Sequence, residues 1–114
     1  MKINSFEEII SWQKGQELAL LIYGLFKSNK DYGFRDQLQR SAVSVSNNIA
    51  EGFERKSNNE FRYFLFIAKG SCAEVRSMSY LASKLDYIDK RNLDIINSLC
   101  FEISKLISGL VKTL

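Results

Sequence analysis

The sequence predicts an all-α protein, an antiparallel up-down-up-down four-helix bundle. Proline is absent from the 114 residues, alternating strand patterns are hard to find, and apolar residues recur at the three- and four-residue steps of a helix. Four such segments of about 20 to 27 residues are joined by short connections, which favour antiparallel neighbours. We expect one domain over residues 1–114, because the composition is ordinary for a single globular unit and nothing marks a linker.

The first predicted helix covers about residues 6–27. Ser5 and Glu8 have the spacing of a capping box, in which a serine oxygen and a glutamate carboxylate each satisfy a free backbone N–H group. The polar segment 28–33, which ends in glycine, is typical of a turn. The second predicted helix therefore follows this turn and covers about residues 34–54.

The third and fourth helices also have recognisable starts. Ser57 and Glu60 repeat the capping-box spacing and place the third helix at about residues 58–85. Asp89 is a favourable N-cap residue directly before the last periodic segment. The fourth helix is therefore predicted at about residues 90–112.

Each of the last three helices has one apolar stripe that we expect to face the core. The stripes comprise Leu38, Ala42, Val45, Ile49 and Phe53 in the second helix, Phe61, Phe64, Leu65, Ala68, Cys72 and Val75 in the third, and Leu93, Ile96, Cys100, Ile103, Ile107 and Leu110 in the fourth. One stripe for each helix is what a four-helix bundle requires.

The first helix differs, because its apolar residues form two stripes. One contains Trp12, Ala19, Tyr23 and Phe26, and the other contains Leu18, Leu21, Ile22 and Leu25. A single bundle core cannot cover both stripes. Two interpretations are open: the helix is broadly buried within a small bundle, or part of its surface meets another subunit.

The second helix carries a polar face nearly opposite its apolar stripe. This face contains Arg40, Ser44, Asn47, Asn48, Glu51 and Arg55. It could simply be solvated, but lysine and glutamate would suit a solvated helix face better, because serine and asparagine lower helix propensity. Amides both donate and accept hydrogen bonds. We therefore predict that these six residues, together with Trp12 and Tyr23, form an interface between copies of the chain.

The third helix carries a row of positive charges. Arg62, Lys69, Arg76 and Lys84 follow one another at steps of seven, seven and eight residues, so they share one side of the helix. Such a row could follow the phosphates of RNA or DNA. A solvated charged face without a ligand is the alternative, because the net charge of the chain is only +3.

The absence of histidine excludes several catalytic and metal sites. Without it there is no conventional serine or cysteine triad, no Glu-x-x-His di-iron site and no HExxH zinc site. Phosphate-binding loops of the GxxxxGK[ST] and GxGxxG types are also absent. We therefore expect a protein that is not an enzyme and that holds no metal ion or cofactor.

Two further features concern the cellular setting. The cysteines, Cys72 and Cys100, are too few for a disulfide framework and lack CxxC spacing, so we expect both to be reduced and buried. No signal peptide is recognisable at the start, and no apolar run approaches the length that crosses a bilayer. A cytoplasmic protein without a membrane partner is the expectation.

Three segments resemble a known family, the 23S rRNA intervening-sequence proteins. They are Trp12-Gln13-Lys14, the stretch 37–52 and the phenylalanine-rich stretch 61–74, which contains Ala68-Lys69-Gly70-Ser71. The resemblance covers almost the whole chain. Two residues depart from the family pattern: Gln39 stands where the first arginine of a pair is usual, and Ser46 stands where proline is usual. Without that proline the second helix should be straighter.

The resemblance implies antiparallel four-helix bundles that assemble into ring-shaped homopentamers. A relative, the accessory variability determinant of diversity-generating retroelements, works with a reverse transcriptase and binds nucleic acid through a basic surface. The function we predict is therefore a non-catalytic homo-oligomer, by resemblance a pentamer, that binds RNA or DNA. The alternative is a scaffold or adaptor that binds another protein and no nucleic acid.

Overall fold

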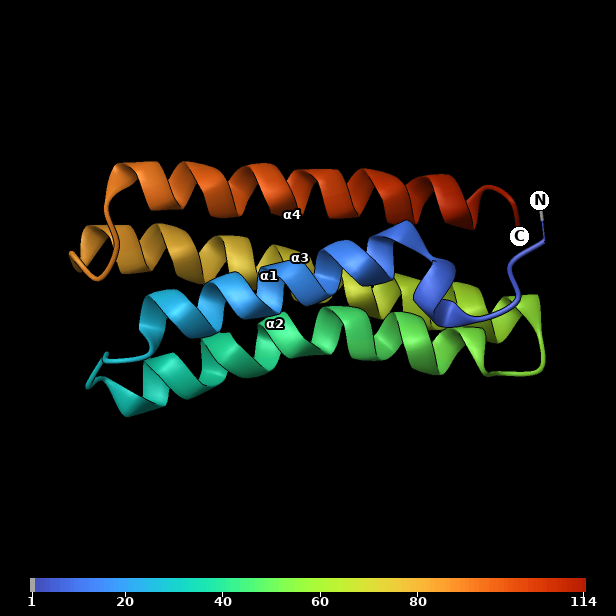
Figure 1. Cartoon of the computed structure of the whole chain (residues 1–114), viewed down its shortest axis with the longest axis horizontal. Helices are drawn as coiled ribbons and strands as arrows, with labels where there is room; N and C mark the ends of the chain where they lie inside the picture. The colour runs from blue at the N-terminus through green and yellow to red at the C-terminus, as the bar shows by residue number, and fades with distance from the viewer. Residues whose placement is uncertain (1) are drawn as a thin grey trace.

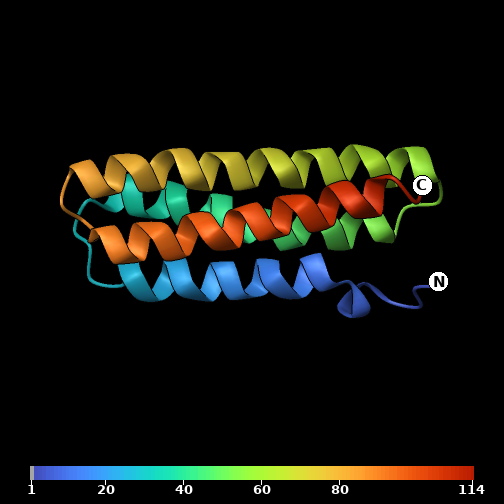
Figure 2. The same ribbon diagram turned by 90° about the horizontal axis from the view of Figure 1, so that it is seen from above.

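A computed structural model describes residues 2–114 and shows four long helices packed side by side (Figure 1). They are α1 (Ile10–Phe26), α2 (Tyr32–Phe53), α3 (Asn58–Lys84) and α4 (Lys90–Val111), preceded by a short 3₁₀ turn, η1 (Phe6–Glu8). Consecutive helices run in opposite directions, α1 also contacts α4, and both termini lie at the same end (Figure 1, Figure 2). The predicted four-helix bundle is confirmed. No helix within residues 2–114 is long and apolar enough to cross a membrane.

Side-chain caps begin the last three helices, and the sequence predicts two of these caps, Ser57 and Asp89. Ser57 accepts a hydrogen bond from the Glu60 N–H at 3.2 Å, and Asp89 accepts one from the Asn92 N–H at 2.8 Å. Each bond satisfies one of the free donors at a helix start. Asp31 caps α2 in the same way, so this helix begins at Tyr32, inside the segment that the sequence pattern assigns to a turn.

The start of α1 differs from the prediction. The Ser5 side chain caps nothing, and the chain leaves η1 through Ile9 in an extended conformation before α1 begins at Ile10. Ile9 is buried, and the Trp12 ring packs on Phe6 with the ring centroids 5.3 Å apart. Burial of these apolar side chains replaces the predicted capping box, so the helix begins at Ile10 and not near Phe6.

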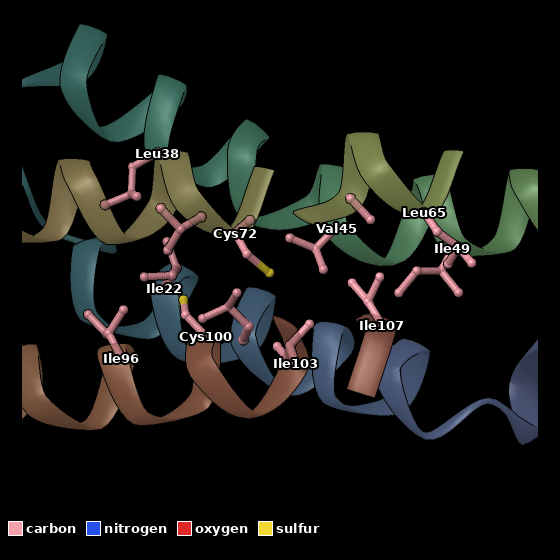
Figure 3. Close-up of a cluster of buried hydrophobic side chains, with 14 of the residues drawn as sticks. Ile22, Leu38, Val45, Ile49, Leu65, Cys72, Ile96, Cys100, Ile103 and Ile107 are labelled. Atoms are coloured by element: carbon pink, nitrogen blue, oxygen red, sulfur yellow. The ribbon is translucent and has the colours of Figure 1, made fainter. Parts of the chain in front are cut away.

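The core contains one apolar stripe from each helix (Figure 3). In α1 this stripe includes Leu18, Ile22 and Phe26, which combines members of both predicted stripes. Phe26 therefore lies in the core, although Tyr23 of the same predicted stripe does not. Tyr23 is exposed, and Leu20, which neither predicted stripe contains, is 76% exposed.

The close contact between α1 and α2 depends on small residues. A Cβ atom on Gly15 would lie 3.2 Å from the Ser46 Cβ, and Gln16 donates a hydrogen bond to the Ser46 hydroxyl at 2.9 Å. Ser46 is therefore buried within its own chain and does not offer space to a second subunit. The helix α2 continues through Ser46 without interruption.

Both cysteines are buried free thiols in the core (Figure 3). Burial raises the pKa of Cys72 to about 12, and burial together with the neighbouring Cys72 raises the pKa of Cys100 to about 12, while Arg76 opposes both shifts. No group of three or more metal-binding side chains occurs within residues 2–114.

We expect neither thiol to react with a disulfide reagent while the protein is folded. A pKa three units above 9.0 lowers the thiolate fraction at neutral pH roughly a thousandfold, and burial blocks access as well. Ellman's reagent should label both cysteines only after urea is added. Rapid labelling in native buffer, with the circular dichroism unchanged, would contradict this burial.

Candidate nucleic-acid and assembly surfaces

The row of cations on α3 lies against α4. The Lys69 ammonium donates a hydrogen bond to the Ser108 hydroxyl at 2.8 Å, and the Arg76 guanidinium lies 4.1 Å from the centre of the Phe101 ring. Arg62 donates to the side chain of Asn59 on its own helix. These three cations are half-buried, whereas Lys84 is exposed at the end of α3. Lys69 and Arg76 of the predicted row therefore lie along the contact between α3 and α4.

The adjoining side of α4 extends this positive surface. Lys105 and Lys112 stand four residues after Phe101 and Ser108 respectively, which places all four residues on one side of the helix. Both lysines are exposed. We call the combined surface the basic α3–α4 face, and its cations are Arg62, Lys69, Arg76, Lys84, Lys105 and Lys112.

The cations of the basic α3–α4 face are not neutralised by carboxylates. Within residues 2–114, none of the six forms an ion pair, whereas cations on the other sides of the bundle, such as Lys14 and Arg55, pair with glutamates. The two acidic residues of α4 pair with other cations: Asp94 with Lys90 at 2.7 Å and Glu102 with Lys14 at 3.8 Å. The Arg76 Nε is buried and has no hydrogen-bond acceptor in the described part of the chain. Positive charge is therefore concentrated on one face of a chain whose net charge is only +3.

The predicted assembly residues separate into two groups. Five of the eight lie around one open hollow of about 380 Å³, which Val43 also lines; they are Tyr23, Arg40, Ser44, Asn47 and Asn48. We call this surface the α1–α2 hollow.

The other three predicted assembly residues lie outside the α1–α2 hollow. Trp12 packs on Phe6 of its own chain. Arg55 pairs with Glu51 at 2.8 Å and lies over the Phe64 ring, near the end of α2. These contacts tie the three residues to their own chain, and the structure does not group them with Tyr23.

Part of the polar face of α2 bonds within the chain. The Asn48 amide donates to both the backbone carbonyl and the hydroxyl of Ser44, each at 2.8 Å. The Ser44 hydroxyl also shares a hydrogen bond of 2.9 Å with the Ser71 hydroxyl of α3. Ser44 therefore joins α2 to α3 and Asn48 bonds within α2, while Asn47 and Arg40 are exposed at the α1–α2 hollow.

A larger hollow, of about 790 Å³, lies between α1 and α4. Charges of both signs line it: Lys14 of α1 pairs with Glu17 at 3.5 Å and with Glu102 of α4 at 3.8 Å. Its mixed charge makes it a poorer site for a polyanion than the basic α3–α4 face. The sequence patterns do not reveal this hollow, because it depends on how far α1 and α4 stand apart.

Comparison with known proteins agrees with the sequence motifs. The pattern that defines the 23S rRNA-intervening sequence protein family matches residues 7–109. A protein of unknown function from the S23 ribosomal protein family of Bacteroides thetaiotaomicron has the same fold, with a TM-score of 0.83 and 27% sequence identity over 90% of this chain and 98% of the relative. None of the curated proteins compared with the chain matches it. The chain therefore belongs to the 23S rRNA-intervening sequence protein family.

Proposed function

We propose that this chain is a non-catalytic, self-associating protein that binds RNA or DNA on the basic α3–α4 face. The observation that carries the proposal is the row of six cations along two adjacent helices, none of which pairs with a carboxylate of residues 2–114. Cations free of internal ion pairs can release the counterions of a phosphate backbone, which is the main source of affinity for nucleic acid. The family name, which refers to 23S rRNA, makes RNA the first ligand to test.

The salt dependence of binding tests this proposal. If about four phosphates of a single strand are contacted, the association constant should fall roughly 50-fold when salt rises from about 50 to about 200 mM. The measurement is the fluorescence anisotropy of a labelled 20-nucleotide RNA, repeated with DNA of the same sequence. Absence of binding to both at about 50 mM salt would overturn the proposal.

The α1–α2 hollow supports the self-association. Tyr23 of α1 is exposed beside the polar surface of α2, and Leu20 of α1 is 76% exposed; apolar area of this kind is often covered by a partner. A second copy of the chain is the partner that we propose. The resemblance to ring-forming relatives makes a pentamer the expected assembly.

Reversal of one charge at the α1–α2 hollow should weaken the assembly. Arg40→Glu is expected to lower the mass measured by light scattering, because repulsion at an interface costs affinity, and to leave the helix content unchanged, because Arg40 is exposed. Arg91→Glu, also exposed but on α4, is the matched control and should keep the wild-type mass. A wild-type mass of 13.1 kDa at micromolar concentration would contradict self-association.

A protein-binding adaptor is the second candidate, and the hollow between α1 and α4 is the observation that favours it. Charges of both signs around an apolar side chain such as Ile95 suit a protein surface better than a polyanion. Co-purification of one protein at stoichiometric amounts, together with no binding to nucleic acid at about 50 mM salt, would favour this candidate.

A further inference from the structure

We infer that the basic α3–α4 face takes single strands, whose bases stack on exposed aromatic side chains between the cations. This inference rests on the proposed function and adds the class of nucleic acid. The argument begins from α3, where Arg62, Phe66, Lys69, Arg76 and Tyr80 occupy one side of the helix at steps that fit its turns. Cations and aromatic rings therefore alternate along this surface.

The aromatic rings of this surface are available to a ligand. Phe66 is 56% exposed, Tyr80 is 45% exposed and Phe101 of α4 is 48% exposed, although large aromatic side chains are usually buried. None of these three rings stacks on another aromatic ring within residues 2–114. The core therefore does not explain why this side of the bundle carries aromatic residues.

The pair formed by Arg76 and Phe101 supplies the central contact. The guanidinium lies 4.1 Å from the ring centre and so covers one side of the ring, while about half of the side chain stays exposed to a second stacking partner. Arg76 forms no ion pair within residues 2–114, and its buried Nε lacks an acceptor. A phosphate beside this pair would find a cation with free donors, and a base would find an exposed ring.

These features fit a single strand better than a duplex. Proteins that bind single strands without sequence preference hold the phosphate backbone on a positive surface and stack successive bases on aromatic rings. Arginine side chains add a cation–π contribution. In a duplex the bases are already stacked on one another, so their faces cannot reach the protein. The phosphates would lie along Lys69, Arg76, Lys105 and Lys112, with bases on the neighbouring rings.

The test compares single strands with a duplex. Fluorescence anisotropy is measured with three labelled ligands: a strand of 20 uridines (U20), a strand of 20 thymidines (dT20) and a 20-base-pair DNA duplex. The proteins are the wild type, the single variant Phe101→Leu and the double variant Phe66→Leu with Tyr80→Leu. Leucine keeps an apolar side chain but cannot stack, and the three sites are exposed, so the fold should persist. Each lost stacking partner should weaken single-strand binding roughly 5- to 150-fold and leave duplex binding unchanged.

A matched control and a second readout make the outcome specific. Tyr32→Leu removes a similarly exposed ring at the start of α2 and should leave all affinities unchanged. The slope of log affinity against log salt should also stay unchanged in Phe101→Leu, because no phosphate contact is lost. Wild-type affinity of Phe101→Leu for both U20 and dT20, or duplex binding as tight as single-strand binding, would overturn this inference alone. Failure of all three ligands to bind would overturn the proposed function itself.

Discussion

Replacement of Gly52 by alanine is expected to destabilise the bundle, although alanine is the better helix former. Gly52 lies near the end of α2, where a Cβ atom would stand 2.7 Å from the Phe64 Cβ and 3.1 Å from the Phe61 ring. The Phe64 Cβ is attached directly to the α3 backbone, so rotation of that side chain cannot relieve the clash. The two helices would have to move apart.

The expected size of this effect follows from two opposing contributions. Extra atoms forced into a packed contact cost about 1 to 3 kcal/mol, and we expect the upper end because a backbone must move. Replacing glycine inside a helix gains about 1 kcal/mol. The net loss in the free energy of unfolding should therefore be about 2 kcal/mol.

A second glycine provides the control for this prediction. Gly70 on α3 has no atom within 4 Å of the position that its Cβ would take, so Gly70→Ala should stabilise the bundle by about 1 kcal/mol. Urea unfolding followed by circular dichroism at one protein concentration would measure both, since assembly makes stability concentration-dependent. The same substitution should act with opposite signs at the two positions. A Gly52→Ala protein as stable as Gly70→Ala would show that α2 and α3 do not approach this closely.

The fold was predictable where local signals and packing agree. Ser57 and Asp89 are followed directly by periodic apolar residues, and both cap helices as predicted. The Ser5 capping box is an equally good local signal, but burial of Ile9 and the contact between Phe6 and Trp12 override it. A local pattern cannot show which side chains a distant helix will cover.

The sequence predicts the part of the candidate nucleic-acid surface that lies on α3, but not the part that lies on α4. Lys69 and Arg76 belong to one helix, so their spacing in the sequence shows that they share a side. Phe101 and Lys105 of α4 join them only because the antiparallel packing sets Arg76 beside Phe101. That register depends on how the core side chains interlock, and no pattern within one helix contains it.

The polar face of α2 shows the same limit. Its serine and asparagine residues are unusual for a solvated helix, and on this ground the sequence predicts a subunit interface there. The sequence does not show that Ser71 of α3 would bond the Ser44 hydroxyl, or that Asn48 would bond Ser44. Part of the hydrogen-bonding capacity attributed to a second subunit is therefore used inside the chain.

Reversal of two charges on α4 is expected to have the largest effect on nucleic-acid binding. Lys105 and Lys112 are exposed and pair with no carboxylate within residues 2–114, so Lys105→Glu with Lys112→Glu should leave the fold intact. Each single-strand phosphate contact contributes about fivefold at 0.1 M salt, so two lost contacts predict a loss of roughly 25-fold, and repulsion by the glutamates adds to it. The negative slope of log affinity against log salt should become shallower by about 1.4.

The matched control separates a local surface from the charge of the whole chain. Lys27→Glu with Lys30→Glu also changes the net charge from +3 to −1, but these exposed lysines lie at the turn between α1 and α2. Screening limits their effect on a ligand more than about 10 Å away at 0.1 M salt, so the slope should match that of the wild type. Equal losses of affinity and slope in both variants would mean that general attraction to a positive protein, and not the basic α3–α4 face, holds the nucleic acid.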